Sequence, residues 1–142
     1  MPKFRVGTYK RLSGTVNPIN YERIEYKHQI EYTNGVVLIM QHGWYTFTAN
    51  ILGPYRDSKK KIHIWLLVDN VGVAHGFRYI RFLTTYLVKE RVFKLHFLSL
   101  GGTTSITYTQ YFNKFQLVQV KKSEGLNRAN PHDDYFEGRM IL

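Results

Sequence analysis

The sequence predicts an all-β protein, a sandwich or jelly roll of about nine or ten short antiparallel strands. Segments of alternating polar and apolar residues recur along the 142-residue chain, and turn signals separate them roughly every eight to twelve residues. Hydrophobic residues make up 44% of the chain, and its eleven Tyr and nine Phe favour strands over helices. We therefore expect one domain with a substantial core.

The clearest strand covers residues 43–51 and begins at a glycine turn. Side chains in a strand point to opposite faces in turn, so this segment has one dry face and one wetter face. The dry face carries Tyr45, Phe47, Ala49 and Ile51, and the other carries Trp44, Thr46, Thr48 and Asn50. The rest of the predicted sheet is organised around this strand.

The N-terminal part predicts a first strand at 3–11 and a loop at 13–20. A second strand is expected at 24–32, where Ile24, Tyr26, His28, Ile30 and Tyr32 share one face. It ends at Asn34-Gly35, a strong signal for a tight turn. The apolar run at 36–40 predicts a short strand that is buried on both sides.

The middle of the chain predicts a strand at 62–68, where Ile62, Ile64, Leu66 and Val68 alternate with His63 and Trp65. Asp69, Asn70 and Gly72 form the following turn. Further strands are expected at 73–79, 82–87, 93–97, 105–108 and 111–120.

A change in composition at Lys121 sets the predicted domain boundary. Residues 1–120 form the domain, and residues 121–142 form a C-terminal extension that is docked or partly disordered. The apolar end of this segment, with Tyr135-Phe136 and Met140 to Leu142, favours the docked arrangement.

A net charge of +10 favours polyanionic partners. The one tight basic cluster, Arg56 with Lys59, Lys60 and Lys61, lies on a predicted loop beside Tyr55. We expect these five residues to contact an anionic ligand, and repetition in an oligomer would add avidity. The alternative is a loop that only aids solubility. A basic nucleic-acid-binding β-barrel is a weaker hypothesis, supported by the charge and the aromatic residues.

Neither catalysis nor metal binding is expected. The six histidines include no His-x-His or His-x3-His pair, and the carboxylates are scattered, apart from Asp133-Asp134. Glu22, Glu25 and Glu31 could form an acid–base set with His28, but alternation places Glu25 and Glu31 on the opposite face of the strand. No nucleophile motif, phosphate-binding loop or cysteine occurs, and no cofactor is expected.

These motifs resemble the globular head domain of the C1q/tumour-necrosis-factor superfamily, on the C1q side. Its glycine–x–Tyr–x–Phe strand matches Gly43, Tyr45 and Phe47, and its following hairpin resembles Ile62–Val68 and Asp69–Gly72. Two further elements are approximated, a Leu–x–x–Gly–Asp–x–Val–x–Leu element and a closing Phe–x–Gly–Phe–x–Leu signature. The first of these elements is approximated by Leu87, Glu90-Arg91, Phe93 and Leu95. The closing signature is approximated by Phe112, Phe115 and Leu117.

The resemblance covers roughly residues 3 to 120, with differences. Glu90-Arg91 stands in place of Gly-Asp, Lys114 stands in place of the closing glycine, and no collagen-like stalk precedes the domain. The resemblance implies a ten-stranded antiparallel jelly-roll sandwich that forms a compact homotrimer. In such trimers the central and last strands line the threefold axis.

That arrangement would place Tyr45, Phe47, Tyr111 and Phe115 near subunit contacts. The surplus of aromatic surface adds Trp44, Trp65 and Tyr108 as interface candidates. The alternative for each is an ordinary role in the core of one subunit.

The resemblance implies a non-enzymatic trimeric module that recognises a protein, glycan or other polyanionic ligand through its loops. It implies an extracellular location, or a location on the surface of a cell or virion, without insertion into a membrane. The first residues, Met1 to Arg5, do not read as a secretory signal, and the chain has no cysteine. The alternative hypothesis is therefore a structural virion protein, such as a capsid, spike or decoration jelly roll.

Overall fold

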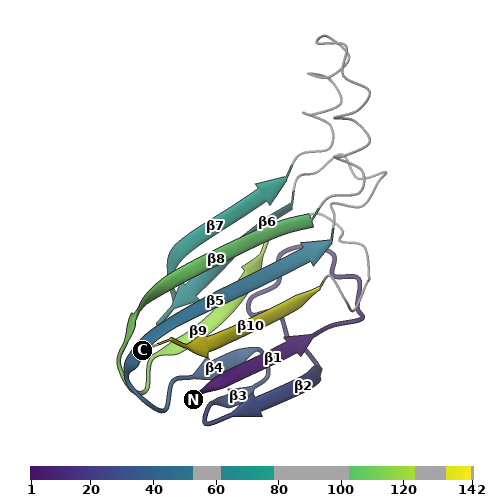
Figure 1. The fold of residues 1–142 in the computed structure, drawn as a ribbon. Helices are drawn as coiled ribbons and strands as arrows, with labels where there is room; N and C mark the ends of the chain where they lie inside the picture. The colour runs from purple at the N-terminus through teal and green to yellow at the C-terminus, as the bar shows by residue number, and fades with distance from the viewer. Residues whose placement is uncertain (53–61, 79–102, 124–133, 142) are drawn as a thin grey trace.

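The structure, a computed structural model, describes residues 1–52, 62–78, 103–123 and 134–141, which form a sandwich of two five-stranded sheets (Figure 1). All strand pairs are antiparallel, and no helix occurs among these residues. The first sheet has the order β2 (Arg23–His28), β1 (Lys3–Gly7), β10 (Tyr135–Met140), β5 (Gly43–Leu52), β8 (Thr103–Phe112). The second has the order β3 (Glu31–Thr33), β4 (Val36–Leu38), β9 (Leu117–Lys122), β6 (Ile62–Val68), β7 (Val71–Arg78). The predicted all-β jelly-roll class is confirmed.

Strand β5 has the predicted dry face and is a central strand of the first sheet. It pairs with β8 over its whole length, from Gly43 opposite Phe112 to Leu52 opposite Thr103, and with β10 on its other side. Tyr45, Phe47 and the rest of the dry face are buried. Because both edges of β5 are hydrogen-bonded, the strand fixes the register of its neighbours.

Aromatic rings from four strands pack on the inward face of the first sheet. The ring centroids of Phe47 and Phe112 lie 5.1 Å apart, and those of Phe4 and Phe136 lie 4.9 Å apart, both pairs edge to face. Gly138 makes room for this packing, since a Cβ atom there would lie 2.5 Å from Phe47 Cδ1 and 2.7 Å from Phe4 Cε1. The rings of Phe4 and Phe47 therefore pack directly against the backbone of β10 at Gly138.

The strand predicted at 24–32 is divided between the two sheets. Strand β2 ends at His28, Gln29 has a φ of 55°, and β3 begins at Glu31. Ile24 and Tyr26 are exposed on β2, an edge strand whose register with β1 shifts between Arg5 and Val6, whereas Tyr32 is buried in the second sheet. The prediction of one continuous apolar face was wrong. The alternation of polar and apolar residues gives no sign that the chain passes from one sheet to the other at a single residue with positive φ.

Two predicted strand limits also differ. In the run at 36–40, Val37 and Ile39 are buried, whereas Met40 is exposed, so the run alternates instead of being buried on both sides. Residues 113–116 separate β8 from β9, so the expected strand at 111–120 is interrupted. Phe115, with a φ of 75°, lies in this turn, and its backbone N–H donates to the Ile39 carbonyl at 2.7 Å.

The C-terminal segment enters the sheet. The sequence assigned residues 121–142 to an extension beyond the domain, but Lys122 ends β9 and residues 135–140 form β10. Strand β10 lies between β1 and β5, with Phe136 opposite both Val6 and Ala49 (Figure 1). Two neighbours hydrogen-bond this strand, so its residues belong to the sandwich itself.

The segment between β1 and β2 closes one side of the second sheet. Val16 forms an isolated bridge with Lys122, and the Ile19 N–H donates to the Val120 carbonyl at 2.8 Å. Lys122 is fully buried and its Nζ donates to the carbonyls of Gly14 and Ser123, each at 2.9 Å. The predicted turns after β3 and β6 are confirmed, with positive φ at Asn34, Gly35, Asp69 and Asn70.

Candidate functional site

The outward face of the first sheet, which we call the first-sheet face, contains a shallow depression of about 590 Å³. Alternation creates this surface, because each residue between two buried ones on β5, β8 and β10 points away from the core. Its lining consists of Lys3, Tyr26, Thr46, Thr48, Thr107, Glu137, Gly138 and Arg139. A broad, open depression of this kind suits a protein surface better than a small molecule.

The floor of the depression is made of short, uncharged side chains. Thr109 Oγ1 donates to Thr46 Oγ1 at 3.0 Å, and the hydroxyls of Thr48 and Thr107 lie 3.5 Å apart. These cross-strand pairs follow from the β5–β8 register, which places Thr46 opposite Thr109 and Thr48 opposite Thr107. Paired hydroxyls leave a low, even surface on which another backbone or sheet can lie.

A charged network occupies the other half of this face. Arg5 Nη1 binds Glu137 at 2.9 Å and Arg5 Nε binds Glu25 at 2.7 Å, while Arg23 also binds Glu25. The Arg5 guanidinium lies over the ring of Tyr135, 4.0 Å from its centroid. Burial lowers the pKa of Arg5, but the hydrogen bonds and charges of Glu137 and Glu25 outweigh it and raise the pKa, so Arg5 stays charged.

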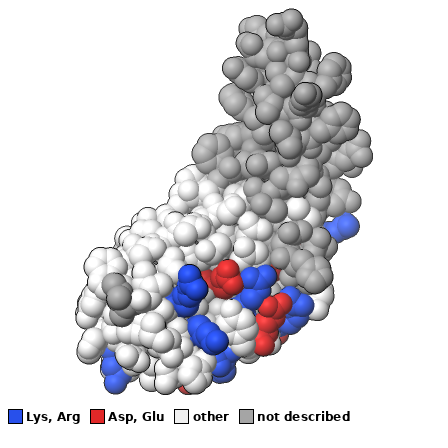
Figure 2. All heavy atoms as spheres, in the orientation of Figure 1, with Lys and Arg blue, Asp and Glu red and all other residues white. Residues whose placement is uncertain are grey.

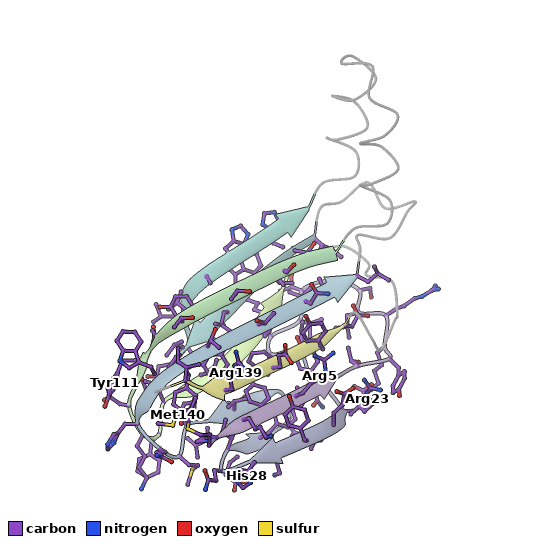
Figure 3. The ribbon with its side chains drawn as sticks, in the orientation of Figure 1. Arg5, Arg23, His28, Tyr111, Arg139 and Met140 are labelled. Atoms are coloured by element: carbon purple, nitrogen blue, oxygen red, sulfur yellow. The ribbon has the colours of Figure 1, made fainter. Side chains whose placement is uncertain are left out.

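The two halves of the face therefore differ in charge. Figure 2 shows the charged side chains gathered where β1, β2 and β10 lie, whereas the surface over β5 and β8 is largely uncharged. Figure 3 shows Arg5 and Arg23 toward one end of the sheet and Tyr111 at the opposite end.

Exposed aromatic residues mark the uncharged end. Trp44 and Tyr111 lie opposite each other on β5 and β8, with ring centroids 6.1 Å apart, and are 45% and 46% exposed. The Ile141 N–H donates to the Trp44 carbonyl at 2.7 Å, which holds the end of the chain beside them. Large apolar rings left in water in this way are typical of protein interaction surfaces.

The predicted interface residues fall into two groups. Tyr45 and Phe47 have no exposed surface, so the structure places them in the core of the subunit, where they support the face from beneath. Tyr111 and Phe115 are exposed, Phe115 by 61%, and their side chains are free to meet a partner. The further candidates Trp65 and Tyr108 are half-buried, and Tyr108 packs against the core of its own subunit.

Several predicted positions lie outside the described residues. They include the ligand-contact candidates Tyr55, Arg56, Lys59, Lys60 and Lys61, and also the motif residues Leu87, Glu90-Arg91, Phe93 and Leu95. In the described part of the chain, no three His, Asp or Glu side chains gather into a group that could hold a metal ion. Within that part there is also no helix with the length and apolar character needed to span a membrane.

No family model and no curated protein matches this sequence. Solved structures do match over nearly the whole chain. Murine APRIL gives a TM-score of 0.69 at 8% identity, covering 99% of this chain and 98% of its own. The globular domain of zebrafish complement 1qA protein gives 0.67 at 12% identity, covering 100% and 98%, and the Eiger TNF of S. frugiperda gives 0.64 at 14% identity, covering 99% and 91%.

This chain has the C1q/TNF-like jelly-roll fold. The match extends over both sheets, and it agrees with the likeness read from the sequence. At identities of 8–14%, the solved structures establish the fold alone. The partner and the ligand are inferred from the surface of this chain.

The last strand of the first sheet is not the segment to which the closing signature was assigned from the sequence. The sequence matched the signature to Phe112, Phe115 and Leu117, with Lys114 in place of glycine. The last strand is instead β10, where Phe136 and Gly138 have the Phe–x–Gly spacing, and Gly138 lies against Phe4 and Phe47. The spacing was readable in the sequence and was missed because residues 121–142 were placed outside the domain.

Proposed function

We propose that this chain is a non-enzymatic binding module that assembles as a homotrimer through the first-sheet face and recognises a protein partner. The full-length match to both C1q-type and TNF-type domains carries this proposal. The resemblance to this superfamily implies compact homotrimers on the extracellular side or on a surface. The exposed pair Trp44–Tyr111 and the level threonine floor suit burial against another subunit.

Molecular mass in solution tests the assembly. We expect sedimentation equilibrium to give three times the 16.8-kDa mass of the chain at micromolar concentration. Tyr111→Asp places a charge in the aromatic end of the face and should shift the population toward monomer. The matched control is Val71→Asp, because Val71 is 64% exposed on β7 of the second sheet.

A wild-type chain that stays monomeric at these concentrations would contradict the trimer. A Tyr111→Asp chain that remains as trimeric as Val71→Asp would remove Tyr111 from the interface.

For the ligand, we propose that the basic cluster of Arg56, Lys59, Lys60 and Lys61, beside Tyr55, contacts an anionic group on the partner, such as a sulfated glycan. Three copies in a trimer would bind a repeating polyanion with avidity. Changing Lys59, Lys60 and Lys61 to Glu should lower the salt concentration that elutes the protein from heparin.

The control for the ligand experiment changes Lys10, Lys27 and Lys114 to Glu, which alters net charge equally at scattered surface positions. Equal loss of heparin retention in both triple variants would show that net charge alone determines binding. Stronger retention of the wild type on single-stranded DNA than on heparin would favour a nucleic-acid partner.

A further inference from the structure

Two histidines from the two strands of the β6–β7 hairpin meet on the outward face of the second sheet. His63 lies on β6 and His75 on β7, and the register places Trp65 directly opposite His75. Ile62 and Ile64 point into the core, so alternation turns His63 outward. His63 and His75 are therefore diagonal neighbours on one face.

Their ring nitrogens face each other. His63 Nδ1 lies 2.5 Å from His75 Nε2, and the two ring planes differ by 7° with centroids 4.7 Å apart. Nitrogens this close cannot belong to rings stacked at van der Waals distance, so the imidazoles meet edge to edge. One proton can lie between the nitrogens, and a metal ion that binds neutral imidazole can replace it.

Trp65 and Ser123 contact this pair of histidines. The Trp65 ring is nearly parallel to both imidazoles, with centroids 5.4 Å from His63 and 4.9 Å from His75. The His63 backbone N–H donates to Ser123 Oγ at 3.0 Å, and its carbonyl accepts from the Ser123 N–H at 2.9 Å. The backbone of His63 is thus held in place, and the side chain of His75 is exposed.

The adjustment needed for coordination is small. Two cis nitrogens at about 2.0 Å from a square-planar Cu²⁺ ion are about 2.8 Å apart, and two nitrogens at about 2.0–2.1 Å from a tetrahedral Zn²⁺ ion are about 3.3 Å apart. A change in the χ angles of His75 would supply this separation while Ser123 holds the His63 backbone. Among the described residues, no third His, Asp or Glu side chain joins the pair.

We propose that His63 and His75 form a two-imidazole site for a divalent transition-metal ion, with Cu²⁺ bound more tightly than Ni²⁺ or Zn²⁺. Imidazole suits these ions, the order follows their general affinity for nitrogen ligands, and Ca²⁺ and Mg²⁺ require oxygen ligands instead. Lys121, whose Nζ lies 5.4 Å from the centroid of the Trp65 ring, opposes binding by its charge. The site does not depend on the proposed trimer.

Calorimetric titration of the full chain with CuCl₂ tests the site. We expect one Cu²⁺ per chain at pH 7.5, no heat with CaCl₂, and quenching of Trp65 fluorescence as the ion binds beside the indole. His75→Gln should weaken Cu²⁺ binding roughly tenfold or more, because the second imidazole then no longer adds its effective concentration. The matched control is His28→Gln, a single exposed histidine on β2, which should bind as tightly as the wild type.

Two further measurements distinguish the loss of a metal ligand from a variant that folds poorly. The electron paramagnetic resonance spectrum of the wild-type Cu²⁺ complex should show two coordinated nitrogens, and one in His63→Gln or His75→Gln. Binding should also weaken at pH 5, where protons compete for imidazole. Equal Cu²⁺ affinity in His75→Gln and wild type, or a wild-type spectrum with one nitrogen, would overturn the proposal.

Discussion

The two layers of the sandwich fill the same core with different kinds of side chain. The inward face of the first sheet is rich in aromatic rings, including Phe4, Tyr45, Phe47, Phe112 and Phe136. Among the described residues, the inward face of the second sheet is mainly aliphatic, with Val37, Ile62, Ile64, Leu66, Val68, Val118 and Val120, and it also carries Tyr32 and the buried Lys122.

The kind of side chain in each layer predicts how much a substitution there destabilises the fold. Rigid rings that meet edge to face leave few alternative packings, so the aromatic layer needs a residue without a side chain, Gly138, to fit them. Aliphatic side chains can shift rotamer and fill small gaps more easily. We therefore expect the largest penalties in the aromatic layer and smaller ones in the aliphatic layer.

The largest effect is expected for Gly138→Ala. The new Cβ atom would lie within 2.7 Å of both Phe4 and Phe47, so the rings or β10 must move. The free energy of unfolding should fall by about 3 kcal/mol or more, measured by urea denaturation.

Two comparisons sharpen this prediction. Gly72→Ala is the control, since its nearest contact would be 3.6 Å from a flexible Leu67 methyl, and it should change stability by less than about 0.5 kcal/mol. Adding Phe47→Leu to Gly138→Ala should recover part of the loss. Equal effects of the two glycine substitutions would show that the rings are not tightly constrained.

An intermediate, pH-dependent effect is expected for Lys122→Met at the edge of the aliphatic layer. Burial lowers the pKa of Lys122 from 10.5 to about 8. Between these values the folded chain has lost a proton that the unfolded chain keeps, so stability of the wild type rises with pH through this window. The gain is on the order of 2–3 kcal/mol and should be missing in Lys122→Met.

The measurement is the difference in unfolding free energy between wild type and Lys122→Met from pH 7 to pH 10. Burial also raises the pKa values of Tyr21, Tyr32 and Tyr45, which lowers stability at higher pH, but this contribution is common to both proteins and cancels in the difference. A difference that is constant with pH would mean that Lys122 does not titrate in this range.

The smallest of these effects is expected for Ile64→Val in the aliphatic layer. Ile64 is buried, and removing one methylene should cost about 1 kcal/mol in thermal or urea unfolding. If Ile64→Val costs as much as Gly138→Ala, the proposed contrast between the two layers fails.

The alternation within 43–51 was enough to predict which side chains of β5 are buried, because a strand has a fixed period of two. The same rule failed at 24–32, where the left-handed Gln29 transfers the chain from one sheet to the other. Pattern rules describe one strand at a time and cannot show which sheet it joins.

The candidate sites show the same division. The exposure of Tyr111 depends on which face of β8 meets the other sheet, and that follows from packing. His63 and His75 are separated by twelve residues, and only the β6–β7 register brings their nitrogens together.

The all-β class, the turns after β3 and β6, and the dry face of β5 could be predicted from the sequence, because they depend on local backbone preference and side-chain alternation. Three features became visible only in the folded chain: residues 135–140 complete the first sheet, Gly138 makes room for the aromatic rings, and His63 meets His75. The first two features arise from contacts between distant segments, whose pairing is chosen by the free energy of the whole packed core. The third depends on the register of the β6–β7 hairpin, which shifts between Leu66 and Leu67.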